Sequence, residues 1–147
     1  MLCPKINDVY YTGTADEWGK ITVGKNNSYL TSANIHFEKL NGTFGNNFTW
    51  TLLKGVLEIS GEGDMPLFGI GTSPWTDYIN EIKTVIIGDK VTSIGGNAFY
   101  DCTALKDVTI GSAVTAVYQC AFYNCTSLES VTLPDAVIGI GNNAFEK

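Results

Sequence analysis

The chain has 147 residues, of which 44% are hydrophobic and 16% charged, so it carries enough apolar side chains to bury a core. Its formal net charge is −6 and all nine basic residues are lysines, which leaves no arginine to bind a phosphate or a carboxylate in bidentate fashion. This charge balance argues against nucleic acid and anionic membrane surfaces as partners.

The sequence contains no apolar run near the ~18 residues that a membrane-spanning helix requires. Its first residues, MLCPKINDVYY, lack the basic start and the apolar stretch of a secretory signal. We therefore expect either a cytosolic protein or a piece of a longer chain. Four cysteines without a C-x-x-C pair, and a single histidine, also predict no disulfide scaffold and no metal site.

Two segments of the N-terminal half predict β-strands. ANIHF, residues 33–37, reads as a strand end, and the alternation of Val56, Leu57 and Ile59 predicts a strand before the glycine turn SGEG. The acidic residues of this region could serve as calcium ligands or as an acid/base pair; they are Glu58, Glu62 and Asp64. Because the D-x-D-x-D-G-x5-E pattern is absent, we interpret them as part of a solvated turn.

The C-terminal half repeats itself every 23 residues. The units are IKTVIIGDKVTSIGGNAFYDCTA from Ile82, LKDVTIGSAVTAVYQCAFYNCTS from Leu105 and LESVTLPDAVIGIGNNAFEK from Leu128. The first two agree at 11 of 23 positions, mostly apolar ones. Such a pattern indicates a solenoid, because stacked units align equivalent residues in continuous columns through a shared core.

Each repeat predicts two short strands, a turn between them and about one helical turn. In the second repeat, Leu105, Val108 and Ile110 would face inward from the first strand, while Asp107 and Thr109 face outward. The segment CAFYNC has the spacing of one helical turn with its apolar side inward. The expected core columns are Val85/Val108/Val131, Ile94/Val117/Ile140 and Phe99/Phe122/Phe145.

The segments LESVTLPDAVIGIGNNAF and VTSIGGNAFYDCTALKDVTI resemble the BspA-like leucine-rich repeats, a family of bacterial and some protozoan cell-surface proteins. They match its pattern L-x-x-V-x-I-P-x-x-V-x-x-I-G-x-x-A-F-x-x-C almost letter for letter. This resemblance implies a mainly β leucine-rich-repeat solenoid with one-turn helices, formed by 23-residue repeats behind a β-rich N-terminal capping segment.

The resemblance also predicts how the chain is divided. Residues 9–37 are similar to the closing repeat of a preceding array, so we expect 1–37 to form a closing-repeat-like β segment. The stretch from Trp50 resembles the β-rich lead-in of such proteins, which suggests a lead-in over 38–81. Three repeats follow at 82–104, 105–127 and 128–147, the last incomplete. The chain would then be cut from a longer one, or be a small relic of one.

One departure from the pattern lies in the middle repeat. Tyr118 stands where the other repeats have Gly95 and Gly141, and Gln119 and Cys120 replace the next two residues of the pattern. If that glycine is needed for a positive φ, tyrosine would strain the corner. We therefore expect an altered loop there.

The cysteines and the histidine are weak candidates for chemistry. Cys102 and Cys125 occupy one repeat column and read as small buried residues. Cys120 reads as a turn residue and Cys3 as part of a frayed terminus. A Cys/His pair would need His36, near which no acidic or amide partner is apparent. The sequence predicts no catalytic residue, no cofactor and no enzyme activity.

Three tryptophans precede the repeats and allow two interpretations. If exposed, Trp18, Trp50 or Trp75 could stack on sugars, as in a glycan-binding accessory module. We favour the other interpretation, in which they are core anchors of a small β domain that closes one end of the solenoid.

The outward rows of the repeat strands are the remaining candidate site. Their residues are Thr84, Ile86, Asp107, Thr109, Ser130 and Thr132. A solenoid offers such a face for docking a protein, although a merely solvated face is an equal alternative.

The resemblance implies a non-catalytic adhesion or protein-interaction module of an extracellular, cell-surface protein, displayed through a longer parent chain. Its ligand would be a host matrix protein or a protein of a neighbouring cell; a structural spacer is the other possibility. The unfinished third repeat exposes Val131, Leu133 and Phe145, so we also expect end-to-end self-association or fraying.

Overall fold

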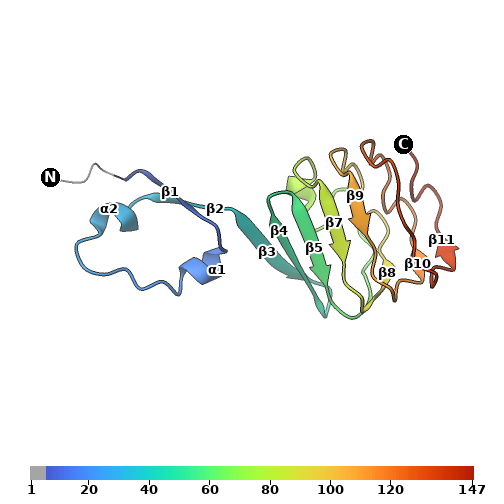
Figure 1. Ribbon diagram of the computed structural model, residues 1–147, viewed down its shortest axis with the longest axis horizontal. Coiled ribbons are helices and arrows are strands. Elements are labelled where there is room, and N and C mark those ends of the chain that lie inside the picture. Colours follow the sequence, from blue (N-terminus) through green and yellow to red (C-terminus); the bar gives the residue numbers. More distant parts are fainter. Residues whose placement is uncertain (1–5) are drawn as a thin grey trace. The chain divides into compact units, whose positions relative to one another are not determined.

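The computed structural model describes residues 6–147, which form two compact units (Figure 1). The first unit ends at Leu40 and the second comprises Asn41–Lys147.

The first unit is one loop of chain closed by a pair of parallel strands. Its elements in order are β1 (Asp8–Tyr11), α1 (Ala15–Trp18), α2 (Ser28–Thr31) and β2 (Asn34–Phe37). Strand β1 pairs with β2 from Asp8↔Asn34 to Tyr11↔Phe37. The ring of Tyr11 packs edge-on against Trp18, with centroids 5.2 Å apart, and against Phe37 at 6.4 Å.

A capping box starts α1. The Thr14 hydroxyl accepts a hydrogen bond from the Glu17 backbone N–H at 3.2 Å, and the Glu17 carboxylate accepts one from the Thr14 N–H at 2.8 Å. The Thr14 N–H stabilises the charged carboxylate and so lowers the pKa of Glu17. This reciprocal pair allows a helix of a single turn to begin at Ala15.

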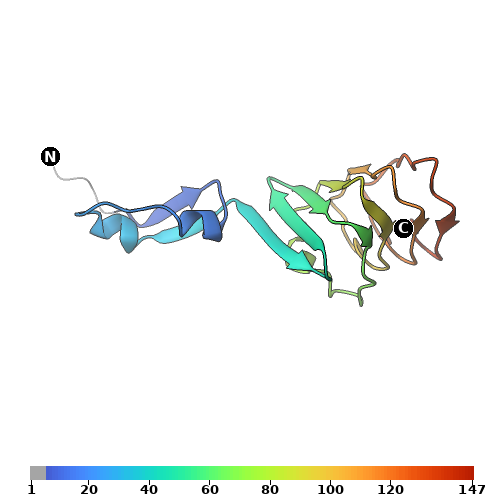
Figure 2. The same ribbon diagram turned by 90° about the horizontal axis from the view of Figure 1, so that it is seen from below.

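The second unit is a solenoid made of two sheets, and its first strand, β3, begins with the last two residues of the first unit, Lys39 and Leu40. The strands are β3 (Lys39–Phe44), β4 (Phe48–Leu53), β5 (Val56–Ser60), β6 (Gly63–Asp64), β7 (Thr84–Ile87), β8 (Val91–Ile94), β9 (Asp107–Thr109), β10 (Ala116–Val117) and β11 (Gly139–Ile140). One sheet has the order β3-β4-β5-β7-β9 and the other β11-β10-β8-β6. A 3₁₀ helix, η1 (Thr76–Tyr78), precedes β7. The turns follow one another from green to red in Figures 1 and 2.

This architecture confirms the predicted leucine-rich-repeat solenoid. In the first sheet the edge strand β3 comes before the antiparallel pair β4–β5. Every later pair of that sheet and every pair of the second sheet is parallel, as coiling in one direction requires. The pairs Thr84↔Asp107 and Ser93↔Ala116 are each 23 residues apart, so the sequence period is the length of one turn.

The expected columns form the core in their earlier members, but Val108, Val131 and Phe145 are only half-buried, and the prediction is wrong for Ile140, which is 54% exposed. Val85, Ile94 and Phe99 are fully buried, and Val117 and Phe122 are 1% exposed. Aromatic rings stack along the axis, with centroid distances of 5.5 Å from Trp75 to Phe99, 4.9 Å from Phe99 to Phe122 and 5.3 Å from Phe122 to Phe145. Trp75 thus occupies the first place in the phenylalanine column.

The segment around each phenylalanine consists of successive turns instead of a helical turn. Its hydrogen bonds join residues three apart, as from the Cys102 N–H to the Phe99 carbonyl at 3.2 Å. Two residues with positive φ, Asn97 at 55° and Asp101 at 61°, flank Phe99 and end any helix at once. Asn124, the counterpart of Asp101, has a φ of 56° and donates a hydrogen bond to the Asp101 carboxylate at 2.8 Å.

The prediction of backbone strain at Tyr118 is wrong. Neither Gly95 nor Gly141 has a positive φ; a Cβ on Gly95 would lie 1.9 Å from the Pro66 carbonyl oxygen, so the glycine is required by the closeness of the neighbouring turn. The positive φ lies two residues later, at Cys120 (53°) in the middle repeat. Among L-residues, asparagine tolerates this conformation better than cysteine does.

We predict that Phe122→Ala lowers the free energy of unfolding of the second unit by about 3–5 kcal/mol, because it removes a buried ring from the middle of the aromatic column. Urea denaturation followed by circular dichroism measures the effect. Thr109→Ala, on the exposed side of β9, is the control and should change stability by less than about 0.5 kcal/mol. Equal stability of both variants would contradict the stack.

A second prediction concerns Cys120, which has a positive φ. Cys120→Asn should raise the free energy of unfolding by roughly 0.5–1 kcal/mol, because it places at this φ the residue that Asn97 and Asn143 already supply in the other turns. Cys120→Val, a β-branched residue at the same position, should instead destabilise the unit. A lower melting temperature for Cys120→Asn than for the unchanged chain would refute the argument.

Candidate interaction surface

The first sheet brings together four of the predicted face residues. In the β7–β9 ladder Thr84 lies opposite Asp107, and Ile86 lies opposite Thr109. Asp107 and Thr109 are exposed, whereas Thr84 and Ile86 are half-buried. Alternation along each strand turns Val85 and Ile87 into the core and these four outward.

The same face extends across β5 and β4, which lie before the repeats and outside the predicted rows. Glu58 of β5 is exposed and lies in register between Ile86 on β7 and Thr51 on β4. The alternation in FTWTLL, where Phe48, Trp50 and Leu52 are buried, was the signal that Thr49 and Thr51 face outward. Glu58, considered above as a possible metal ligand, is therefore a face residue.

Ser130 and Thr132 do not extend the paired rows. Both are exposed, but residues 129–132 form no strand, and β9 is the last strand of its sheet. A hollow at this place is lined by residues of the second and third repeats: Lys106, Asp107, Ser127, Glu129 and Ser130. The regular part of the surface thus runs from β4 to β9.

The tryptophans do not form an exposed platform. Trp75 is fully buried and donates a hydrogen bond from Nε1 to the Ala98 carbonyl at 2.8 Å, and Trp50 is 7% exposed. Neither can stack on a sugar in this structure, so the glycan alternative is wrong for both, and their packing against other aromatic rings makes them core residues. Trp18, in the first unit, is half-buried.

Two cysteines lie deep in the solenoid. Cys102 is fully buried and Cys125 is 2% exposed, with its thiol 3.2 Å from the Phe99 carbonyl. Burial away from water raises the pKa of the Cys102 thiol far above its ordinary value and raises that of Cys125 to about 12. Both thiols are therefore protonated and unreactive at neutral pH. Cys120 is half-exposed at its corner, and Cys3 lies outside the described residues.

His36 does have an acidic partner, contrary to the sequence interpretation. Its Nε2 lies 3.0 Å from Asp8 Oδ1, and its ring stacks on Tyr10 with centroids 4.7 Å apart. Hydrogen bonds to His36 and then to Asn34 hold the pKa of Asp8 below its usual range. The facing strands β1 and β2 bring these residues together, which local sequence cannot reveal.

The acidic turn residues have separate contacts. The Asp64 carboxylate accepts a hydrogen bond from the Thr92 hydroxyl at 2.7 Å, and Glu62 lies 3.9 Å from the Lys90 ammonium. Within residues 6–147, no three His, Cys, Asp or Glu side chains gather closely enough to hold a metal ion. No helix in this range has the length and apolar character needed to cross a membrane.

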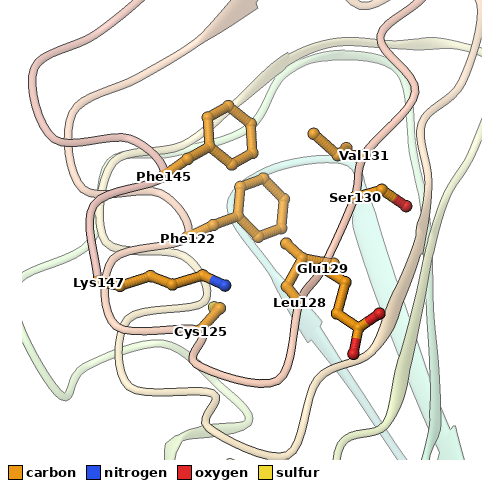
Figure 3. Close-up of a pocket in the computed structure, with 8 residues that line it drawn as sticks. All are labelled: Phe122, Cys125, Leu128, Glu129, Ser130, Val131, Phe145 and Lys147. Carbon is orange, nitrogen blue, oxygen red and sulfur yellow. The ribbon is translucent and has the colours of Figure 1, made fainter.

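The third turn presents an apolar hollow of about 280 Å³ (Figure 3). It is lined by Phe122, Cys125, Leu128, Glu129, Ser130, Val131, Phe145 and Lys147. In the figure the parallel rings of Phe122 and Phe145 lie on one side and Val131 on the other, with Lys147 and Glu129 at the rim. Of these residues, Phe122, Phe145 and Val131 belong to the core columns described above.

The stacked parallel turns, the columns and the outward sheet face define a leucine-rich-repeat solenoid. A family model of the BspA type leucine rich repeat region, in 6 copies, matches residues 75–147. The chain belongs to this family through these residues.

Solved structures of bacterial leucine-rich repeat proteins are similar. One from Eubacterium ventriosum has 32% sequence identity and a TM-score of 0.70, over 74% of this chain and 29% of that one. One from Bacteroides ovatus has 21% identity and a TM-score of 0.47, over 71% of this chain and 32% of that one.

A leucine rich cell surface protein from Faecalibacterium prausnitzii has 20% identity and a TM-score of 0.25, over 72% of this chain and 52% of that one. At TM-scores this low, it and the Bacteroides protein support no conclusion about function. No curated protein matches the chain. The chain spans about a third or less of the first two structures.

We predict that iodoacetamide at pH 8 alkylates Cys125 of the folded chain at least about a hundredfold more slowly than Cys120, because burial and the raised pKa keep its thiolate scarce. Peptide mapping by mass spectrometry distinguishes the two sites. In concentrated urea both should react at similar rates. Equal rates in the folded chain would show that Cys125 is accessible.

Proposed function

We propose that this chain is a non-catalytic protein-interaction module of a bacterial cell-surface protein, and that it binds a protein ligand through the outward face of its first sheet. The ligand would be a host matrix protein or a surface protein of a neighbouring cell. The family and the fold are those of repeat proteins that commonly act through extended surfaces. Cell-surface display would come from a longer parent chain.

The strongest support for this proposal is the register of the paired strands that form this face. Ile86 lies between Glu58 and Thr109 on the neighbouring strands, and Thr84 lies beside Asp107. An isoleucine among polar and acidic side chains combines an apolar contact with hydrogen-bonding groups, as protein interfaces do. The pairing holds each position on a rigid element, so a ligand would meet a fixed pattern.

We infer the domain roles from the same resemblance. Residues 1–37 would be a closing-repeat-like segment, 38–81 a lead-in and 82–147 the three repeats. The burial of Trp50 and Trp75 in the second unit supports a capping role for the lead-in. A glycan-binding role would now depend on Trp18 alone, and a structural spacer is the remaining alternative.

The proposal predicts that binding to matrix proteins requires the face. The purified chain and a variant with Ile86→Glu, Thr109→Lys and Thr132→Lys would be tested by surface plasmon resonance against matrix proteins, mucins and polysaccharides. We expect the chain to bind one protein ligand and the variant to lose at least about tenfold in affinity, because three contacts are replaced by charges.

The control carries the same three charge changes at exposed positions elsewhere on the solenoid, as Ile138→Glu, Thr115→Lys and Gln119→Lys. Folding is checked by thermal melting, since exposed substitutions cost little stability. Loss of binding in the control alone would place the site on the other sheet. Binding only to polysaccharide, abolished by Trp18→Ala, would support the glycan alternative, and no binding by any chain would support a spacer.

A further inference from the structure

The middle repeat departs from the repeat pattern at three successive positions, those of Tyr118, Gln119 and Cys120. The first and third repeats have Gly-Gly-Asn and Gly-Asn-Asn there, as residues 95–97 and 141–143. Cys120 adopts a positive φ that asparagine tolerates better, and Tyr118 remains 41% exposed, so the replacements do little for the stability of the solenoid. Residues that break a repeat pattern without such a gain are expected at functional sites.

The exposure of Tyr118 does not arise at an end of the stack. The Tyr118 N–H donates to the Ile94 carbonyl at 3.0 Å, and the Val117 carbonyl accepts from the Gly141 N–H at 2.7 Å, so a turn packs on each side of this corner. The counterparts of Tyr118 in those turns are Gly95 and Gly141, which have no side chain. The tyrosine ring is therefore not covered by any side chain of its own column.

A hollow of about 420 Å³ lies at this corner, lined by Leu67, Tyr118, Gln119, Gly141 and Asn142. Leu67 is 67% exposed, and Gln119 and Asn142 are exposed as well. Within residues 6–147 the side-chain amides of Gln119 and Asn142 form no hydrogen bond. No lining side chain carries a carboxylate or an ammonium group, so the hollow suits an uncharged ligand.

The lining residues come from different turns and form a row along the solenoid. A Cβ on Gly96 would lie 3.6 Å from both Leu67 Cδ2 and Gln119 Cγ, so these two side chains flank the first repeat from the turns on either side. Asn142 lies one turn beyond, because its carbonyl accepts from the Cys120 N–H at 3.0 Å. Since hydrogen-bonded strands lie about 4.8 Å apart, two turns separate Leu67 from Gln119 by roughly 9.6 Å.

This spacing matches the repeat of a polyproline II helix. Such a peptide rises about 3.1 Å per residue with about three residues per turn, so every third side chain recurs after about 9.3 Å. Two prolines three residues apart can therefore contact Leu67 and Tyr118 together. The peptide carbonyls make no internal hydrogen bonds, and the amides of Gln119 and Asn142 can donate to them.

We propose that this hollow binds an uncharged, proline-rich segment of a partner protein in the polyproline II conformation, with one proline ring on Tyr118 and another on Leu67. Grooves with aromatic side chains recognise such segments repeatedly, because the peptide is already ordered before it binds. The site follows β10 of the second sheet and shares no lining residue with the first-sheet face proposed above. It is therefore a second, independent contact.

A sugar is the other uncharged ligand that an aromatic ring and two amides could bind. Leu67 argues against it, because its side chain offers no hydrogen bond and would bury sugar hydroxyls without partners. A proline ring on Leu67 loses no hydrogen bond. The exposed leucine at one end of the row thus favours a peptide.

The test is an NMR titration of the isotope-labelled chain with an acetylated and amidated peptide of about nine prolines, roughly three turns of the helix. We expect saturable shifts of the side-chain amide signals of Gln119 and Asn142. Tyr118→Ala should weaken binding at least about tenfold, because it removes the ring on which proline packs. Tyr118→Phe keeps the ring and should bind within about threefold of the unchanged chain.

Tyr29→Ala is the matched control, because it removes a tyrosine that is 51% exposed in the first unit. It should bind the peptide as the unchanged chain does, and so should Ile86→Glu on the first sheet, which separates this site from the face proposed above. Circular dichroism checks that every variant keeps its fold. A blocked glycine-serine peptide of the same length should not bind, because it is not ordered in advance.

Three outcomes would overturn the proposal. The first is no saturable binding of the proline peptide, and the second is equal binding by Tyr118→Ala or by the glycine-serine peptide. The third is binding of a neutral oligosaccharide such as maltohexaose in place of the proline peptide, lost in Tyr118→Ala, which would identify the hollow as a sugar site.

Discussion

The solenoid depends on the contact between an aromatic ring in one turn and the ring 23 or 24 residues further along the chain. Each ring fills the space above the previous one, so Phe99 and Phe122 are removed from water by their neighbours in the column. Backbone hydrogen bonds run beside the rings, as from Phe99 to Ala121 and from Phe122 to Ala144. Rings and hydrogen bonds together fix one register for every turn.

That register also determines the surface. When the turns are aligned, the strands of both sheets are aligned with them, and alternation sends every second side chain outward in rows. Glu58, Ile86 and Thr109 are neighbours because their strands pair, although they are far apart in sequence. A substitution in the aromatic column would therefore disturb the outer face as well as the core.

The repeats were predictable from the sequence because a 23-residue period has one physical explanation, the stacking of equivalent residues. The columns through Ile94 and Phe99 followed directly from it. The corner at Tyr118 did not, because glycine can serve either positive φ or close approach, and only the distance from Gly95 to Pro66 distinguishes them.

Contacts between strands far apart in the sequence were the second feature that the sequence could not predict. The partnership of His36 with Asp8, and the place of Glu58 beside Ile86, arise when distant strands meet. The period predicted three equal rows on the outer face, but it could not show that residues 129–132 leave the ladder. The repeat pattern predicts the structure of an interior turn better than that of a terminal turn. An interior turn packs against a neighbour on each side, and both contacts require the same positions to be apolar.

Trp75 gives the solenoid a defined origin. Its ring starts the column, and its indole N–H satisfies the Ala98 carbonyl, the acceptor that a backbone N–H of an earlier turn would otherwise occupy. A turn inserted between Trp75 and Phe99 would have to supply both a ring over Phe99 and an N–H group for the Ala98 carbonyl, as Phe99 itself does for Phe122 and for the Ala121 carbonyl. At Trp75 the column thus changes from residues that bond the next turn through their backbone N–H to one that does so through its side chain.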